Sequence, residues 1–267
     1  MKVGIPKLFA FDLDGTLTQH KTPLSDENRA VLEKLAKKSR LCMVGAGMCR
    51  RIFEQMGHFP IDIIGNYGMQ TAIYNNTLMD IEIIADNSVP TDRDSVERRV
   101  TDLRERYGYT DFKGDNVEYH SSGCVTFPLL GTKADQKDKL TFDPDRKKRR
   151  AFYGEVKRLF PEYTVFVGGS SSFDMAPKPY NKYYALNAYC NERGIAHGEV
   201  VFVGDDYGEG GNDESVYLSD FGFEKIDNYL DFPKIMKKGS VKLKWKDSSR
   251  NHRKASRNEQ KLPFSLF

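Results

Sequence analysis

The sequence predicts an α/β fold, in which a parallel sheet forms a core and an α+β segment interrupts it. Two observations support this prediction. Short, wholly apolar runs have the length and composition of strands buried on both faces, and helical periodicity separates them. These runs are 8–11, 41–44 and 200–203, and a further strand that contains one acid, Asp62, is expected at 61–64. Between 86 and 180 the expected order changes to helix, strands, helix, strands, which does not continue a parallel sheet.

The first half of the expected core alternates strands with helices and ends in a hairpin. Ser25 is a suitable N-cap for the helix that follows the first strand. A short helix is expected over 50–56, after the second strand. Strands at 69–74 and 78–84 flank the polar turn 75–77, which is typical of a β-hairpin.

The inserted segment has its own order of elements. Asp143 precedes a proline, and proline is favoured at the first position of a helix. The expected elements are a helix opened by a capping box at 91–94, strands at 117–119 and 124–130, a helix over 143–160, and strands at 164–167 and 173–176.

The core then resumes with a helix over 182–193, which Gly194 ends. We therefore expect a Rossmann-like core formed by 1–85 and 181–245, a cap formed by 86–180, and a tail over 246–267.

The apolar runs and the cysteines indicate where the protein is located. The 267 residues contain no apolar run long enough for a membrane helix, and the N-terminal residues 1–7 lack the apolar part of a signal peptide. The four cysteines show no CxxC spacing and most lie among apolar or helical residues. They are Cys42, Cys49, Cys124 and Cys190. We expect reduced core thiols and a cytoplasmic protein without a membrane partner.

Positive charge gathers near the end of the chain. Residues 237–261 hold ten Lys or Arg against two acids, a local charge of +8 that leaves −5 for the rest of a chain whose total is +3. The stretch 246–257 has no apolar periodicity, so we expect a solvated basic tail. No aromatic or structural context for nucleic acid accompanies it, and a nucleic-acid partner is not expected.

Two carboxylates follow the first apolar run. Asp12 and Asp14 stand at i and i+2, which lie on the same side of an extended chain, and Gly15 permits a sharp turn after them. The carboxyl ends of strands are where open α/β sheets bind ligands. Crowded acids repel each other, so a divalent cation or a raised pKa is expected. An acidic turn without function is the alternative for a lone Asp-x-Asp.

The stretch 9–18, FAFDLDGTLT, resembles the first motif of the haloacid dehalogenase (HAD) superfamily. That resemblance implies phosphoryl transfer through an aspartyl-phosphate with Mg²⁺. Asp12 would be the nucleophile, and Asp14 the general acid and base that also offers its carbonyl to the metal. Gly204-Asp205 and Asn212-Asp213 match the fourth motif, so Asp12, Asp14, Asp205 and Asp213 are the expected metal site, with Asn212 beside it.

A lysine that neutralises the phosphate is also expected. Lys182 stands at a helix start after the insert, where the superfamily carries this lysine, and Lys178 is the competing choice. A lysine at a helix N-terminus opposes the helix dipole, which favours a nearby anion.

Within the superfamily, the chain is similar to the eukaryotic-type phosphomannomutases of the type II cap class, to about residue 238. The segments 167–174, 181–186 and 210–213 carry this similarity. It implies that Ser172 and Asp174 contact a sugar phosphate, and that a homodimer forms through the caps.

Two departures separate the chain from those mutases. Gly47 stands where their second motif has a serine, which leaves backbone N–H groups as donors to the phosphate. The segments 120–124 and 131–132 lack the arginines of the mutase cap, and bidentate arginine contacts contribute about 1.5–3 kcal/mol each. Lys113, Lys133 or His120 could replace them, although lysine does not reproduce the arginine fork.

Three functions follow from these residues. The first is a Mg²⁺-dependent phosphatase acting on a small phosphorylated metabolite such as a sugar phosphate. The second is a phosphomannomutase that interconverts mannose 6-phosphate and mannose 1-phosphate and needs a bisphosphate activator. The third is a catalytically weak binding protein, suggested by the missing hydroxyl at Gly47 and opposed by the intact acids and lysine.

Overall fold

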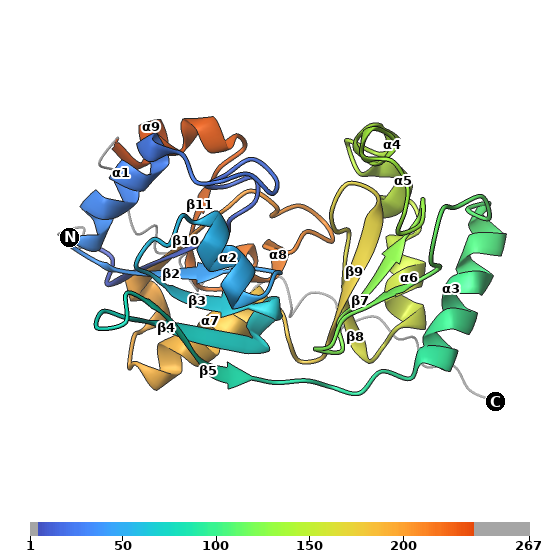
Figure 1. Ribbon diagram of the computed structural model, residues 1–267, viewed down its shortest axis with the longest axis horizontal. Coiled ribbons are helices and arrows are strands. Elements are labelled where there is room, and N and C mark those ends of the chain that lie inside the picture. The colour runs from blue at the N-terminus through green and yellow to red at the C-terminus, as the bar shows by residue number, and fades with distance from the viewer. Residues whose placement is uncertain (1–4, 238–267) are drawn as a thin grey trace, which may run out of the picture.

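The computed structural model of the protein describes residues 5–237, so the basic tail expected over 246–267 lies outside the described residues. Two sheets form two bodies side by side (Figure 1). We call the part built on the seven-stranded sheet the core, and the part built on the four-stranded sheet the cap. In the described part of the chain, no helix is both long and apolar enough to cross a membrane.

The core sheet confirms the predicted α/β class. Its order is β11-β10-β1-β2-β3-β4-β5, parallel from β11 to β3 and antiparallel in the β4–β5 hairpin. The strands are β1 (Leu8–Phe11), β2 (Arg40–Val44), β3 (Asp62–Gly65), β4 (Gln70–Asn75), β5 (Asp80–Asp86), β10 (Val200–Gly204) and β11 (Gly222–Lys225). Strand β11 was not predicted from the sequence, because this edge strand carries too few apolar residues to stand out.

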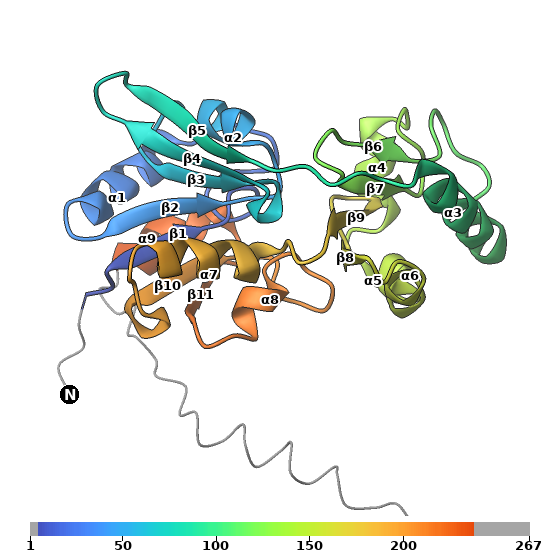
Figure 2. The same cartoon turned by 90° about the horizontal axis from the view of Figure 1, so that it is seen from below.

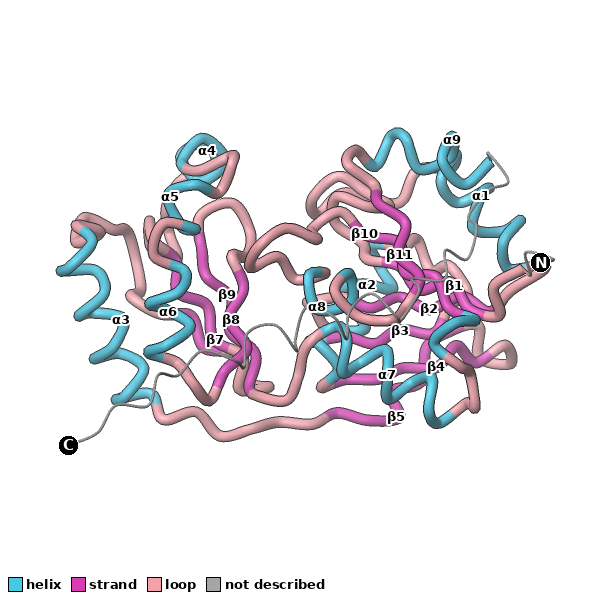
Figure 3. Tube along the Cα trace, turned by 180° about the vertical axis from the view of Figure 1, so that it is seen from behind, coloured by secondary structure: helices cyan, strands magenta, loops and turns pink. Residues whose placement is uncertain are grey.

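Helices cover both faces of this sheet (Figures 1 and 3). On one face pack α1 (Asp26–Ala36), α2 (Cys49–Gln55) and α9 (Phe232–Lys237), and on the other pack α7 (Lys182–Glu192) and α8 (Glu214–Tyr217). Ser25 caps α1 as predicted, because its hydroxyl accepts a hydrogen bond from the Asn28 N–H. Short 3-10 turns lie at Asn66–Gly68, His197–Glu199 and Tyr229–Asp231.

The cap is an antiparallel sheet with helices on the side away from the core (Figure 1). Its order is β6-β7-β9-β8. The strands are β6 (Glu118–Tyr119), β7 (Val125–Pro128), β8 (Tyr163–Phe166) and β9 (Ser172–Pro177). Phe173 and Met175 of β9 pack in the cluster that includes α3 (Arg93–Tyr107) and α6 (Tyr153–Leu159). Because strand side chains alternate, Ser172 and Asp174 lie on the opposite face, toward the core.

Two sequence predictions in the cap are wrong. The capping residue of α3 is Asp92 rather than Thr91, since the Asp92 carboxylate accepts a hydrogen bond from the Ser95 N–H at 3.1 Å. The helix expected over 143–160 is broken into α5 (Lys147–Arg150) and α6, and an unpredicted α4 (Gln136–Phe142) precedes them.

The break has a side-chain cause. The carboxylate of Asp143 accepts from the backbone N–H groups of Lys148 and Arg149 and from Arg149 Nε at 2.9 Å. Arg149 Nη1 in turn donates to the backbone carbonyls of Gly168 and Ser172. Asp143 therefore organises a buried arginine instead of starting a continuous helix.

Two chain crossings and an apolar contact join the core to the cap (Figure 2). The rings of Tyr67 and Phe166 are stacked with their centroids 4.5 Å apart, and Cys124 Sγ lies 3.7 Å from Met69 Sδ. The Val167 N–H also donates to the carbonyl of Gly210 at 2.8 Å. The four cysteines are free and buried, as expected for reduced thiols; the cytoplasmic location stays a prediction.

Candidate active site

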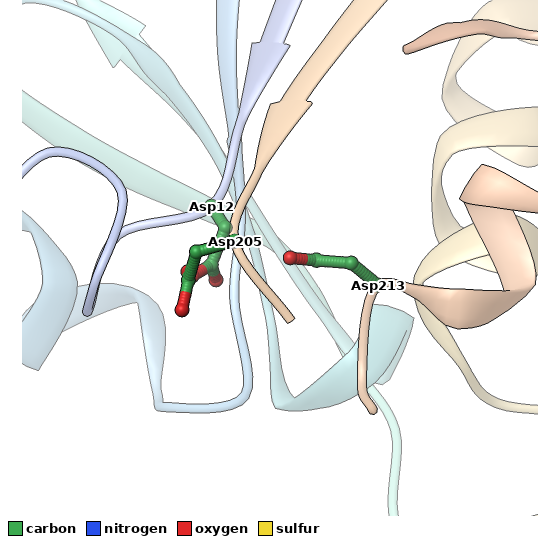
Figure 4. A group of neighbouring side chains, drawn as sticks. All are labelled: Asp12, Asp205 and Asp213. Carbon is green, nitrogen blue, oxygen red and sulfur yellow. The ribbon is translucent and has the colours of Figure 1, made fainter. Parts of the chain in front are cut away.

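Three carboxylates meet at the carboxyl edge of the core sheet (Figure 4). Strands β1 and β10 are neighbours, with Phe11 paired to Val203, so Asp12 and Asp205 leave the sheet side by side. Asp213 reaches them from the start of α8. One oxygen of each of Asp12, Asp205 and Asp213 lies within 4.8 Å of the others. Pairing of β1 with β10 thus brings Asp12 to Asp205 and Asp213, which lie far from it in the sequence.

Lys182 bridges two of these acids. Its Nζ donates to Asp12 Oδ1 at 2.5 Å and to Asp213 Oδ1 at 2.7 Å, and its side chain is fully buried. Burial lowers the pKa of Lys182, but the carboxylates of Asp12 and Asp213 outweigh burial and leave that pKa raised. The lysine therefore stays charged beside Asp12. The competing candidate, Lys178, is exposed and donates to the carbonyl of Pro161 instead.

The acids carry more negative charge than Lys182 offsets. Burial, followed by repulsion from Asp12 and Asp213, raises the pKa of Asp205 to about 8, although Thr16 Oγ1 donates to it at 2.8 Å. Burial also raises the pKa of Asp213 to about 6, against the opposing effect of Lys182. Without another cation, part of this group must hold a proton at neutral pH.

These residues fit a hard divalent cation. Such ions take oxygen ligands, and three carboxylates converge here. Asn212 precedes Asp213 in the chain, and its Oδ1 is the one buried side-chain N or O atom in residues 5–237 that lacks a hydrogen-bond partner. An amide oxygen without a donor beside crowded carboxylates is suited to a cation or to its water molecules.

Asp206 shapes the loop that holds Asp213. Its N–H donates to Asp213 Oδ2 at 3.0 Å, and its carbonyl accepts from the Asp213 N–H at 3.0 Å. Its carboxylate accepts from the Asn212 N–H at 3.1 Å. A Cβ at Gly211 would lie 2.1 Å from the Asp206 carbonyl oxygen, so only glycine fits there.

Asp14 lies apart from the three clustered carboxylates. Its Oδ1 accepts from the Lys21 N–H at 2.8 Å and from Gln55 Nε2 at 2.7 Å. Arg51 Nη1 is 3.8 Å from its Oδ2. Asp14 is thus held by α2 and its own loop. Neither Gln55 nor Arg51 was predicted from the sequence, because nothing in a short helix shows which side chains turn toward a distant strand end.

The cap presents a polar row toward the core. Ser172 Oγ donates to Asp174 Oδ1 at 3.3 Å, and Thr126 Oγ1 donates to the same oxygen at 3.1 Å. His120 Nε2 lies 3.2 Å from Thr126 Oγ1. Burial raises the pKa of Asp174, although the two hydroxyls oppose this. The predicted sugar-phosphate contacts therefore form one hydrogen-bonded row on the cap.

Two lysines considered as replacements for the mutase arginines contribute little to that row. Lys113 Nζ pairs with Asp135 at 2.7 Å, and both side chains are exposed. Lys133 is exposed as well. His120 alone among the three candidates is linked to Asp174, through Thr126.

The fold and the site together define an α/β enzyme with an acidic, cation-suited centre at the edge of its sheet and a separate cap. The chain belongs to the haloacid dehalogenase-like hydrolases, whose family model matches residues 9–213. Curated relatives include the phosphomannomutases of Encephalitozoon cuniculi, 25% identical over 79% of this chain and 84% of that protein, and of Saccharomyces cerevisiae, 26% identical over 80% and 85%. The protein is therefore an enzyme of this superfamily, and either a phosphatase or a mutase activity fits.

Solved structures show the same fold. A haloacid dehalogenase-like hydrolase from B. subtilis aligns with a TM-score of 0.55 at 15% identity, over 86% of this chain and 99% of that one. The IMP-nucleotidase of Plasmodium falciparum aligns with a TM-score of 0.60 at 13% identity, over 87% of this chain and 68% of that one. The recognition of a HAD-like fold from sequence is confirmed.

Proposed function

We propose that the protein is a Mg²⁺-dependent phosphatase that forms an aspartyl-phosphate at Asp12 and acts on a small phosphorylated metabolite, most simply a sugar phosphate. The observation that carries the proposal is the contact of Lys182 with Asp12 and Asp213 beside Asp205. The charged ammonium group of Lys182 contacts the reactive carboxylate, and the group of three acids that would hold a second cation includes the same carboxylate.

The ligands of the cation would be Asp12, Asp205 and Asp213, with the backbone carbonyl of Asp14. Asn212 would orient it or its waters. When bound, Mg²⁺ supplies positive charge that offsets the phosphate and the crowded acids.

The protein residues carry the chemical steps. A carboxylate oxygen of Asp12 attacks the phosphorus and displaces the leaving oxygen, while Lys182 neutralises the equatorial phosphoryl oxygens. Asp14 gives its proton to the leaving oxygen. It then takes a proton from the water that attacks the phosphorus of the aspartyl-phosphate, which releases inorganic phosphate and restores Asp12. The contacts from Gln55 and the Lys21 N–H fix the orientation of the Asp14 carboxyl group.

The cap favours a phosphatase over a mutase. A mutase must hold the distal phosphate of a bisphosphorylated intermediate while that intermediate reorients in the site. The row formed by His120, Thr126, Ser172 and Asp174 contains a carboxyl group and hydroxyls rather than arginines. Such groups can hydrogen-bond sugar hydroxyls, but they lack the paired, permanently charged donors by which arginine holds a second phosphate. We propose that residues 86–180 act as the cap that selects the substrate.

The second candidate is phosphomannomutase activity, which the relatives named above favour. A mutase would need a second phosphate clamp, for which His120 is the candidate on the cap face. The same relationship is the basis for proposing a homodimer formed through the caps, which sedimentation of the purified protein would test.

One experiment tests the proposal and separates these candidates. Purified protein with Mg²⁺ is given a panel of sugar phosphates, and both free phosphate and phosphate migration are measured. We expect released phosphate that disappears on chelation with EDTA and in Asp12→Asn. Migration between the 1- and 6-positions of mannose, dependent on a bisphosphate activator, would instead establish the mutase. Turnover that survives in Asp12→Asn would contradict an aspartyl-phosphate.

A further inference from the structure

We propose that the guanidinium of Arg51 contacts the transferring phosphate in the place of the side chain that Gly47 lacks. The proposal rests on the proposed function and adds to it a catalytic residue. It also accounts for glycine at position 47, where the sequence resemblance leads one to expect a hydroxyl.

Arg51 occupies the volume of the absent side chain. A Cβ built on Gly47 would lie 2.2 Å from Arg51 Nη2, 2.5 Å from its Nε and 2.6 Å from its Cζ. No atoms approach so closely in a real structure, so any side chain at 47 and this position of Arg51 exclude each other. Gly47 does not have the left-handed backbone conformation that glycine alone tolerates, so space rather than backbone strain is the constraint.

Neighbouring side chains hold the guanidinium at this place. Arg51 Nη1 donates to Gln55 Oε1 at 2.7 Å, and Gln55 Nε2 donates to Asp14 Oδ1 at 2.7 Å. Arg51 Nη1 also lies 3.8 Å from Asp14 Oδ2. Arg51 is therefore tied, directly and through Gln55, to the residue proposed to manage protons at the phosphorus.

Donors on Arg51 remain for a ligand. Within residues 5–237, Nε and Nη2 donate to no protein acceptor, and the side chain is 40% exposed. A guanidinium offers two parallel donors that match two phosphoryl oxygens, which a serine hydroxyl cannot. Its charge also offsets acids that Lys182 alone does not balance.

The adjacent arginine provides a matched control. Arg50 lies in the same helix but turns away, donating to Asp80 at 2.6 Å and lying over the ring of Phe53. Its removal takes one positive charge from α2 without touching Gly47 or Asp14. An effect of general charge would appear in both arginine variants, whereas a phosphate contact would appear only in that of Arg51.

The test compares Arg51→Ala, Gly47→Ser, the double variant Gly47→Ser/Arg51→Ala and Arg50→Ala. Binding of inorganic phosphate to the Mg²⁺-loaded protein is measured by calorimetry, and kcat and KM are measured on the best substrate. We expect Arg51→Ala to weaken phosphate binding and to lower kcat/KM by tenfold or more, and Arg50→Ala to change both by less than twofold. Gly47→Ser should displace Arg51 and therefore weaken phosphate binding and lower kcat/KM by as much as Arg51→Ala does. The double variant should recover part of the loss, because the serine hydroxyl then has room.

Equal effects of Arg51→Ala and Arg50→Ala on phosphate binding and kcat/KM would overturn the proposal. A double variant with weaker phosphate binding and lower kcat/KM than either single variant would overturn it too. Wild-type protein that binds phosphate but turns over no ester would refute the proposed function, while the Arg51 contact would still be judged from binding. Wild-type protein that binds no phosphate would overturn both. Thermal unfolding of each variant shows whether a loss reflects misfolding.

Discussion

Asp206 of the core and Arg146 of the cap form an ion pair, and it is the one ion pair that joins core to cap within residues 5–237. Arg146 adopts a left-handed backbone conformation, with φ of 60°, that arginine rarely takes. Such local strain persists only where surrounding contacts stabilise it. Because Asp206 also orders the loop around Asp213, the pair links the position of the cap to the acidic centre.

Breaking this pair should loosen the cap. In Arg146→Ala we expect faster amide exchange at Val167, whose N–H is bonded to Gly210 of the same core loop. The pair is partly buried, so a loss of about 1 kcal/mol is expected, equivalent to an exchange rate several-fold faster. Hydrogen exchange with mass spectrometry measures it. Lys147→Ala is the control, because Lys147 pairs only with the exposed Asp145. Unchanged exchange in Arg146→Ala would show that the remaining contacts between cap and core hold the cap without this pair.

Metal-free protein should be less stable in alkaline solution. The pKa of Asp205 is raised to about 8, whereas the unfolded carboxyl titrates near its ordinary value of about 3.9. The folded state therefore binds more protons between these values, and stability falls as the pH rises through this window. We expect a loss of about 2–3 kcal/mol from pH 5 to pH 8.5, less than the full shift because the carboxylate is partly hydrated.

Asp205→Asn isolates that effect. It removes one of the mutually repelling charges, so the metal-free variant should be more stable than the wild type at pH 8 and should lose most of the pH dependence. Mg²⁺ should stabilise the wild type and leave the variant unchanged. Urea unfolding with and without MgCl₂ measures both. Equal stabilisation of the two proteins by Mg²⁺ would exclude Asp205 as a ligand.

Asp174→Asn tests the cap as the part that reads the substrate. The change keeps the size of the side chain but alters an acceptor that two hydroxyls share. We expect KM for the best sugar phosphate to rise about tenfold, because a charge-assisted hydrogen bond contributes about 1.5–3 kcal/mol. Activity on p-nitrophenyl phosphate, which has no sugar hydroxyls, should change less than twofold. An equal loss of activity on the sugar phosphate and on p-nitrophenyl phosphate would indicate a disturbed fold instead.

Arg149→Met should destabilise the protein strongly. It leaves the buried carboxylate of Asp143 without its partner, and removing one member of a buried pair costs about 3–5 kcal/mol. Burial opposes the lowered pKa of Asp143, but hydrogen bonds from Arg149 and Lys148 outweigh it. The wild-type contribution is therefore present above pH 4 and is lost as the pH falls below it. Urea unfolding measures the loss of unfolding free energy in this variant, and Arg158→Ala, at an exposed arginine, is the control. A loss below 1 kcal/mol in Arg149→Met would contradict the prediction.

The sequence predicted what depends on local patterns. Asp12 directly follows the apolar run that became β1, and Asp205 directly follows β10. Parallel pairing of those strands is enough to bring the two carboxylates together. The Ser25 cap and the glycine after α7 likewise depend on neighbours in the chain. Motif spacing then indicated the family.

Side-chain contacts that depend on the tertiary fold were not predictable in this way. Asp143 has the sequence of a helix start, yet its carboxylate serves Arg149, which is buried against the β8–β9 loop. Arg51 resembles any exposed helical arginine until the fold places it over Gly47. In both cases tertiary packing overrides a local preference.

The order of strands also bears on how the chain is made. β1 lies between β2 and β10, and all strands of the cap are synthesised between those two neighbours. On the ribosome the cap is complete before the partner on one side of β1 has emerged. The first strand, which Asp12 follows, therefore has one unpaired edge, accessible to a chaperone or to non-native pairing, until β10 has been synthesised.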